Sequence, residues 1–312
     1  MQISSKSSWP AVLSSGARVA LVCGSGPLRG ESDVAIAEAS VRGFGWEPVR
    51  GRHVLGRRGY LAGSDAERLS DVQWALDDPA IDAVWLVRGG FGLTRIVPAL
   101  SLEAFMRRPR AVIGYSDVTA LHCAIAARAG VVTFHGHTGR APLPALSAAS
   151  LHAAVSGSAE PCGVWEDAAV VREGVVTGRL AGGNLALLAA LCGTPDAVRG
   201  AGAILVLEDV NEAAYRVDRQ LRQLEQAGAF RGCVGLAVGQ FTQVPEDEHP
   251  GATSIGALVS ELADRLQVPC LANLPIGHIA DQWTLPLGAE ATLDAAARSL
   301  VIRDAVRRIT VA

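Results

Sequence analysis

This chain of 312 residues has neither an excess of basic over acidic residues nor long apolar runs. The 28 Lys and Arg face 31 Asp and Glu, so the net charge is −3 and no basic surface is expected for a nucleic acid. No window of the sequence approaches the roughly 18 unbroken apolar residues of a membrane-spanning helix. We therefore expect neither a nucleic-acid partner nor a membrane partner.

Cysteine is also scarce, with six residues scattered along the chain. They lack the density of a disulfide framework and the C-x-x-C spacing of many metal sites. Most stand in apolar runs, which is typical of reduced thiols that pack as small hydrophobic side chains. The apolar run at residues 19–23 is too short for the core of a signal peptide. We therefore expect a cytoplasmic protein.

What the chain does have is enough length for two domains, because single cores usually divide at roughly 250–300 residues. In the first half, predicted strands and helices alternate, which indicates a parallel sheet with helices on both faces. The strands are expected at 19–23, 83–87, 111–114 and 131–134, and the helices at 33–43, 66–76 and 118–129.

The composition changes after His135, where residues 141–172 become rich in Ala, Ser and Pro, with one short helical stretch expected near Leu151. We expect a flexible lead-in over 1–17, a first domain over 18–140, a linker over 141–173 and a second domain over 174–312. The second domain is expected to hold helices at 184–192, 215–227 and 254–266 and strands at 203–207, 234–238, 291–293 and 300–302.

Ser116 lies on the turn between a predicted strand and a predicted helix. Such a turn exposes the hydroxyl and places N–H groups of the helix start beside it, ready to receive an oxyanion. This makes Ser116 a candidate nucleophile. Alternatively, Ser116 only caps the helix, with Asp117 in the first turn.

Two distant residues favour the nucleophile. Glu208 follows the apolar strand at 203–207, and His278 lies in a loop beside a glycine. A serine hydroxyl is a weak nucleophile, so a histidine must accept its proton and a carboxylate must orient the ring. The order Ser116, Glu208, His278 is that of α/β-hydrolases, but Val118 replaces the second glycine of their G-x-S-x-G elbow. The three residues come from both domains, so we expect the site between them.

Five segments carry a resemblance to a known family: RGGFG, GYSDVTA, GGNLALL, LEDVNE with YRVDR, and GH with TLPLG, at residues 88–92, 114–120, 182–188, 207–219 and 277–288. In this order they resemble the LD-carboxypeptidases, a serine peptidase family that includes the microcin C immunity peptidases. The resemblance implies a flavodoxin-like or class I glutamine amidotransferase-like N-terminal domain with a parallel sheet, and a smaller C-terminal α/β domain. The active site would lie in the cleft between the two domains.

The family's Ser–His–Glu triad maps onto Ser116, His278 and Glu208. By the same resemblance, the oxyanion hole uses the N–H of Asp117 and one N–H of the R-G-G turn, which we assign to Gly90. Its neighbour Gly89 is then expected to contact substrate. A homodimer is expected by analogy with the family.

The resemblance implies a cofactor-free hydrolase that forms an acyl-enzyme and releases C-terminal D-alanine from the L,D-bond of muropeptide tetrapeptides in peptidoglycan recycling. One alternative is a microcin-type peptidase that cleaves aminoacyl-nucleotide conjugates. Another is a catalytically silent protein that binds muropeptides. Residues 137–140 depart from the family's H-G-P pattern, which affects the expected shape of the pocket.

Three other features allow more than one interpretation. Gly24-Ser25-Gly26 follows a strand, but residues 27–30 do not complete the dinucleotide motif G-x-G-x-x-G. His135 and His137 could form a metal pair, yet no carboxylate or cysteine stands at ligand spacing, so we expect no metal site. Asn184 either caps a helix or binds the substrate backbone.

Overall fold

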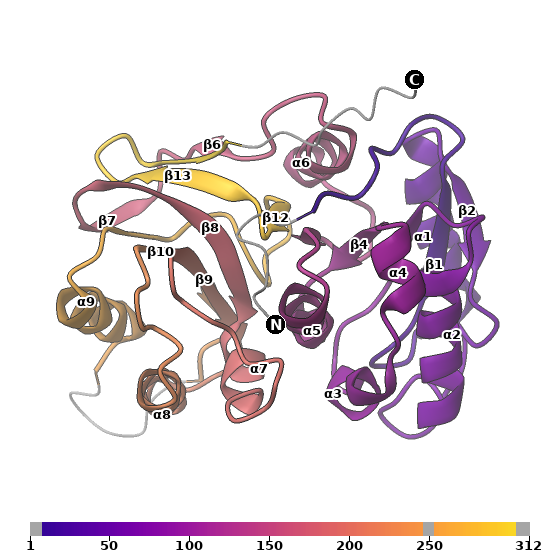
Figure 1. Cartoon of the computed structure of the whole chain (residues 1–312), viewed down its shortest axis with the longest axis horizontal. Helices are drawn as coiled ribbons and strands as arrows, with labels where there is room; N and C mark the ends of the chain where they lie inside the picture. Colours follow the sequence, from indigo (N-terminus) through magenta and orange to yellow (C-terminus); the bar gives the residue numbers. More distant parts are fainter. Residues whose placement is uncertain (1–7, 246–252, 304–312) are drawn as a thin grey trace.

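Two β-sheets lie side by side in the computed structural model of the chain, which describes residues 8–245 and 253–303 (Figure 1). The first sheet consists of β1 (Arg18–Val22), β2 (Glu47–Arg50), β3 (Ala83–Leu86), β4 (Ala111–Gly114), β5 (Thr133–His135) and β12 (Leu285–Leu287). Their order across the sheet is β12-β5-β4-β3-β1-β2. The strands pair in parallel except β12, which is antiparallel to β5.

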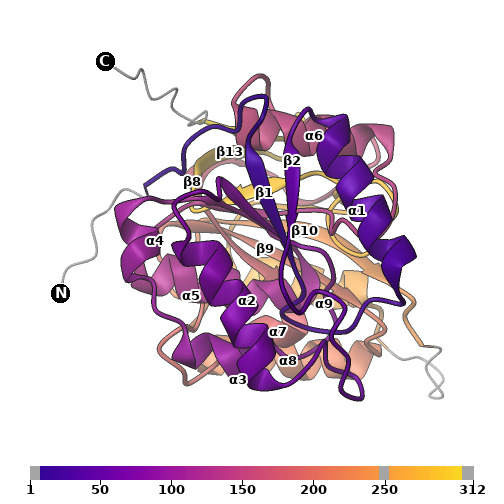
Figure 2. The same ribbon diagram turned by 90° about the vertical axis from the view of Figure 1, so that its right-hand side faces the viewer.

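Helices cover both faces of the first sheet. The strands are apolar runs because alternate side chains enter two different cores. Helix α1 (Glu31–Gly43) and α6 (Ala145–Ser156) pack on one face. The other face is covered by α2 (Asp65–Asp77), α3 (Leu93–Ile96), α4 (Glu103–Arg107) and α5 (Thr119–Arg128), with 3-10 turns η1 (Val97–Ala99) and η2 (Ser116–Val118). Figure 2 shows α1 and α2 on opposite sides of β1 and β2.

The second sheet is mixed. Its strands are β6 (Gly163–Val164), β7 (Ala169–Arg172), β8 (Val175–Asn184), β9 (Ala203–Val210), β10 (Gly235–Thr242), β11 (Cys270–Ala272), β13 (Glu290–Asp294) and β14 (Ser299–Ile302). Their order is β6-β14-β13-β8-β9-β10-β11-β7, with β8 to β11 parallel and the other pairs antiparallel. The predicted α/β class with a parallel first sheet is confirmed.

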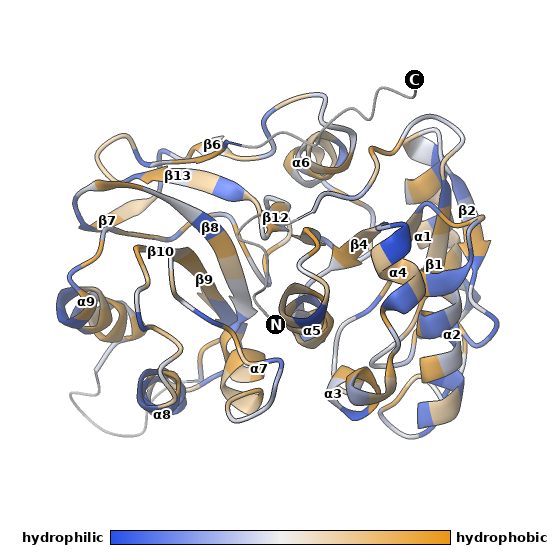
Figure 3. Cartoon of the chain, viewed as in Figure 1, coloured by the Kyte–Doolittle hydropathy of each residue, from blue (hydrophilic) through white to orange (hydrophobic). Residues whose placement is uncertain are grey.

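Three helices pack on one face of the second sheet: α7 (Leu185–Ala190), α8 (Ala214–Gln226) and α9 (Ile255–Leu266). In α9 the apolar side faces the sheet and the hydrophilic side faces away from it, as Figure 3 shows. None of the helices in the described part of the chain is long and apolar enough to span a bilayer.

The structure adds detail to three expectations. The segment expected as a linker holds α6, where a short helical stretch is expected, and also β6 and β7, which belong to the second sheet. Residues 8–17 of the expected lead-in pack on the first domain, because Leu13 is buried and the Ser8 N–H donates to the Gly130 oxygen at 2.8 Å. Residues 1–7 lie outside the described residues. The long strand β8 was not expected, since its glycines weaken a strand pattern.

Candidate active site

His278 lies within hydrogen-bond distance of both Ser116 and Glu208. The His278 Nε2 lies 3.1 Å from the Ser116 Oγ, and the His278 Nδ1 lies 2.8 Å from the Glu208 Oε2. When Nδ1–H donates to the carboxylate, Nε2 is left as the acceptor for the serine proton. Ser116 follows β4, Glu208 lies in β9, and His278 lies in the loop between β11 and β12, so both sheets contribute.

Ser116 stands in a strained backbone conformation. Its φ is 66°, in the left-handed region that a residue with a Cβ rarely adopts. The Ser116 side chain caps neither η2 nor α5, and within the described residues its only side-chain hydrogen-bond partner is His278. The helix-cap alternative is therefore wrong. The turn directs the hydroxyl toward the second sheet at a cost typical of strained functional residues, about 1–3 kcal/mol.

The R-G-G turn approaches the nucleophile directly. A Cβ on Gly89 would stand 2.8 Å from the Ser116 Cβ and 3.0 Å from its Oγ, so only glycine permits this approach. The Gly89 oxygen accepts from the Gly26 N–H at 3.1 Å. The N–H groups of Gly90 and Asp117 donate none of the hydrogen bonds found in the described part of the chain. Both remain free for an oxyanion, and their assignment to the oxyanion hole stays a prediction.

The Asp117 side chain stabilises the serine turn through hydrogen bonds to neighbouring segments. Its carboxylate is fully buried, and its Oδ2 accepts from the Ser25 hydroxyl at 2.6 Å and from the Leu93 N–H at 2.9 Å. Burial raises the pKa of this carboxyl group. The Gly24-Ser25-Gly26 loop, which invited a dinucleotide interpretation, therefore supports the serine turn.

A polar network behind Glu208 fixes the second half of the site. Asn184 pairs with Glu208 in the parallel register of β8 and β9. The Asn184 Nδ2 donates to the Asp209 Oδ1 at 2.9 Å, and its Oδ1 accepts from the Leu187 N–H at 3.2 Å. Asn184 thus caps α7, while its expected substrate contact stays a prediction. Burial is the main cause that raises the pKa of Asp209 to about 6.

The loop glycine beside the histidine is sterically required. A Cβ on Gly277 would stand 2.5 Å from the Glu208 Oε2, the oxygen that holds the imidazole ring. Gly277 also has a φ of 103°, which favours glycine. A larger residue here would displace either the carboxylate or the ring.

Sequence reasoning missed Tyr115 and Asp209. The Tyr115 ring lies 4.8 Å from the His278 ring between centroids, and burial raises its pKa. Nothing in the sequence around Tyr115 distinguishes it from a core residue. Asp209 could have been suspected only from the register of β8 and β9, which brings it to Asn184.

His135 and His137 do not form a metal pair with other ligands in the described residues, where no group of three or more His, Cys, Asp or Glu gathers. His135 is fully buried, and burial lowers its pKa to about 3. Neither of its ring nitrogens has a hydrogen-bond partner in the described part of the structure. The His137 ring turns back to the Thr138 oxygen. That the site needs no metal stays a prediction.

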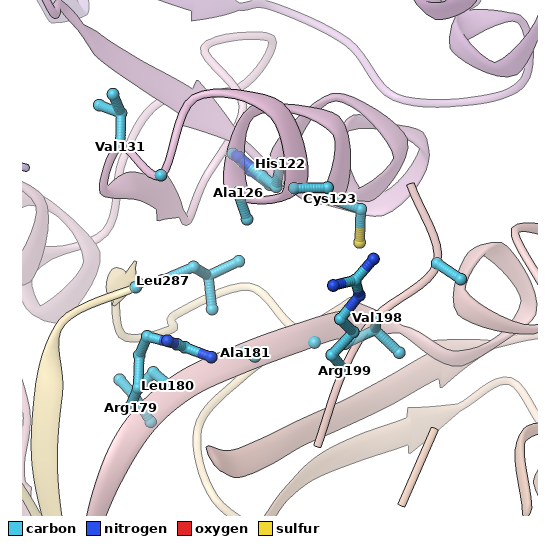
Figure 4. Close-up of a pocket in the computed structure, with 15 residues that line it drawn as sticks. His122, Cys123, Ala126, Val131, Arg179, Leu180, Ala181, Val198, Arg199 and Leu287 are labelled. Atoms are coloured by element: carbon cyan, nitrogen blue, oxygen red, sulfur yellow. The ribbon is translucent and has the colours of Figure 1, made fainter. Parts of the chain in front are cut away.

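A cavity of about 230 Å³ lies between α5 and β8, apart from the three candidate residues, none of which lines it (Figure 4). His122, Cys123, Leu287 and two arginines, Arg179 and Arg199, are among its lining residues. In Figure 4 the Arg199 side chain extends toward Cys123, and that of Arg179 lies along β8.

Comparison with known proteins identifies the family of the chain. Residues 19–136 match the model of the LD-carboxypeptidase N-terminal domain, and residues 177–293 match that of the C-terminal domain. A putative carboxypeptidase of Streptomyces coelicolor is 38% identical over 306 residues, covering 94% of this chain and 95% of the relative. The murein tetrapeptide carboxypeptidase of Pseudomonas aeruginosa is 37% identical over 256 residues, covering 78% and 82%.

Solved structures show the same fold. The muramoyltetrapeptide carboxypeptidase of Oxalobacter formigenes superposes with a TM-score of 0.81 at 29% identity, covering 93% of this chain and all of that one. The microcin C7 self-immunity protein MccF superposes with a TM-score of 0.86 at 22% identity, covering 95% and 98%. The sequence resemblance is thereby confirmed, and the chain belongs to the LD-carboxypeptidase family.

Proposed function

We propose that this chain is a serine LD-carboxypeptidase that hydrolyses the L,D-peptide bond of muropeptide tetrapeptides and releases C-terminal D-alanine. One observation carries the proposal: the Ser116 hydroxyl, the His278 ring and the Glu208 carboxylate form a continuous hydrogen-bonded relay. This arrangement activates a serine for attack on a carbonyl carbon. In this proposal Ser116 is the nucleophile, His278 the general base and Glu208 the group that orients the ring.

Acylation follows from these positions. The Ser116 Oγ bonds to the carbonyl carbon of the residue before D-alanine, and its proton passes to the His278 Nε2. The buried Glu208 carboxylate stabilises the imidazolium that forms. When the tetrahedral intermediate collapses, the C–N bond breaks and His278 gives the proton to the nitrogen of the departing D-alanine. Water then adds to the ester carbonyl carbon while the His278 Nε2 takes one of its protons. The bond between that carbon and the Ser116 Oγ breaks, the shortened peptide leaves, and His278 returns the proton to Ser116.

The N–H groups of Asp117 and Gly90 are the proposed oxyanion donors. Both belong to segments that meet at Ser116, and neither is used by another hydrogen bond of the described residues. Donors fixed before the reaction stabilise the charge that develops on the carbonyl oxygen by about 3–4 kcal/mol each in other enzymes. Gly89 packs beside the serine and is the proposed point of contact with the substrate backbone.

The substrate class is supported by the relatives. Those with tetrapeptide carboxypeptidase names share more sequence with this chain than the microcin immunity protein does. We also propose a cytoplasmic location, for which the support is the set of free, mostly buried cysteines. A homodimer and a division into domains near residues 141–173 remain proposals by analogy and composition.

Mass spectrometry of two reactions tests the function. The protein is incubated with a muropeptide tetrapeptide and, separately, with an aminoacyl sulfamoyl adenosine. We expect the tetrapeptide to lose one alanine and the adenosine conjugate to remain intact. Cleavage of the conjugate alone would identify a microcin-type peptidase, and binding of the tetrapeptide without cleavage would identify a silent binding protein.

A further inference from the structure

Among the described residues, three half-buried arginines have a guanidinium group without a hydrogen-bond or ion-pair partner: Arg88, Arg140 and Arg179. The fully buried Arg68 and Arg110 differ, because carbonyl oxygens hold the guanidinium groups of both and Asp65 pairs with Arg68. A guanidinium that loses water without gaining a partner is destabilised. Such a group is a candidate for binding an anion from outside the chain.

Arg88 belongs to the R-G-G turn beside the nucleophile. A Cβ on Gly26 would stand 3.3 Å from the Arg88 Nε and 3.1 Å from the Gly89 oxygen, so the side chain lies over Gly26. A Cβ on Gly90 would in turn stand 3.2 Å from the Gly26 nitrogen. The Arg88 side chain and the proposed oxyanion donor Gly90 therefore both lie against Gly26, and Arg88 directly precedes the glycine that contacts Ser116.

Arg140 ends the segment 137–140, which departs from the family pattern and lies beside the same turn. The Trp85 Nε1 donates to the His137 oxygen at 2.9 Å, and a Cβ on Gly139 would stand 3.5 Å from the Val87 Cγ1. These contacts hold residues 137–140 along the end of β3, where the R-G-G turn begins.

The positive charge of Arg140 acts on Arg88 and on Tyr115 of the active site. Burial, and after it the Arg140 charge, lowers the pKa of Arg88. Burial raises the pKa of Tyr115, whose ring packs on His278, and the Arg140 charge opposes that rise. The charge of the Asp33 carboxylate acts on both arginines, but this carboxylate is already held by the Arg29 side chain, with 3.0 Å between the Arg29 Nε and the Asp33 Oδ1.

We propose that Arg88 and Arg140 form the subsite that binds the terminal α-carboxylate of the substrate, an inference that rests on the proposed carboxypeptidase function. The α-carboxylate of a C-terminal residue is only a few bonds from the scissile carbonyl, so it must lie close to Ser116. Guanidinium groups bind carboxylates through paired N–H donors. A peptide that continued past this residue would present a neutral amide and leave both cations unpaired, which restricts cleavage to chain ends.

Paired substrates test the subsite. We compare a tetrapeptide ending in D-alanine with the same peptide ending in D-alaninamide, for the wild-type protein and for Arg88→Gln and Arg140→Gln. For the free acid we expect kcat/KM to fall about 10- to 100-fold in each variant, the usual effect of losing a hydrogen bond to a charged group. For the amide we expect a change below about 3-fold, so each variant loses the preference for the acid.

Arg179→Gln is the matched control, because it removes another half-buried guanidinium that has no partner among the described residues and that lines the cavity away from Ser116. It should leave both rates unchanged. Thermal unfolding of each variant separates folding damage from substrate effects, and Arg88→Lys provides a conservative variant that keeps the charge and should restore part of the preference.

Binding to the Ser116→Ala protein separates this proposal from the proposed function. Calorimetry should show that the acid binds more tightly than the amide, and that adding Arg140→Gln abolishes the difference. Equal loss of acid and amide rates in folded arginine variants, or equal binding of both peptides, would overturn the subsite. A wild-type protein that releases no alanine while still preferring the acid would overturn the proposed function instead.

Discussion

Ser116 stands on the strained turn after β4, as the first residue of η2, whereas Glu208 lies inside a regular strand and is fully buried. The first half of the molecule thus presents its reactive group through local backbone geometry. The second half holds its carboxylate through strand pairing and the Asn184–Asp209 network. The position of the nucleophile and the position of the carboxylate thus depend on different kinds of interaction. Substitutions at the turn and substitutions in the strand should therefore have different effects on the enzyme.

The largest effect is expected at the turn. Ser116→Ala removes the Oγ that attacks, so turnover should fall about 10⁴- to 10⁶-fold, as in other serine peptidases. The fold should remain, because the Ser116 side chain makes no cap and the turn is held by Asp117. Release of D-alanine and circular dichroism measure the two results. Normal turnover in this variant would end the serine-peptidase proposal.

The next effect is expected in the strand. Glu208→Gln keeps the shape but removes the charge that stabilises the imidazolium, so kcat should fall about 10²- to 10⁴-fold while KM changes little. Steady-state kinetics on the tetrapeptide checks this split. A variant with near-normal kcat would show that His278 acts without the carboxylate.

The pH dependence of stability tests the Asn184–Asp209 network that supports the strand of Glu208. Burial raises the pKa of Asp209 from 3.8 to about 6, so the folded protein binds this proton more tightly than the unfolded chain. The resulting stabilisation is present below pH 3.8 and is lost as the pH rises to about 6. Wild type should therefore lose about 3 kcal/mol relative to Asp209→Asn across this window.

Urea unfolding of both proteins at pH 3.5 and pH 7.5 measures this difference. The comparison of the two proteins cancels the titration of groups that they share. A free-energy difference that does not change with pH would show that Asp209 is not destabilised by burial.

A smaller effect, on the free energy of unfolding, measures the backbone strain at Ser116. At a φ of 66°, glycine lacks the Cβ that makes the conformation costly, so Ser116→Gly should be about 1 kcal/mol more stable than Ser116→Ala. Both variants are inactive by design, so urea unfolding compares stability alone. Equal stabilities would show that the turn relaxes in solution.

The smallest effect is expected from chelation. The proposed mechanism uses no metal, so EDTA should leave the rate nearly unchanged. Tetrapeptide hydrolysis with and without EDTA provides the measurement. Inhibition by EDTA that zinc reverses would reopen the metal interpretation of His135 and His137.

Local sequence signals predicted the first half of the site better than the second. The apolar strand, the serine and the following helix are consecutive, so Ser116 could be placed on its turn from the sequence. A glycine-flanked loop and a strand end indicate His278 and Glu208 as candidates. That these two residues lie side by side depends on the pairing of strands that are distant in the sequence. The strand β8 escaped prediction because Gly178, Gly182 and Gly183 interrupt its pattern, and the partners of Asp209 escaped with it.

The edge strand β12 has a consequence for the order of synthesis. Residues 285–287 pair with β5, so the first sheet takes a strand from nearly the end of the chain. While the ribosome is still adding the second half, β5 has an unpaired edge, and such edges invite association with other chains. The nascent protein can complete its first sheet only after residue 287 has left the exit tunnel. The first sheet therefore cannot finish folding before most of the second sheet has been synthesised.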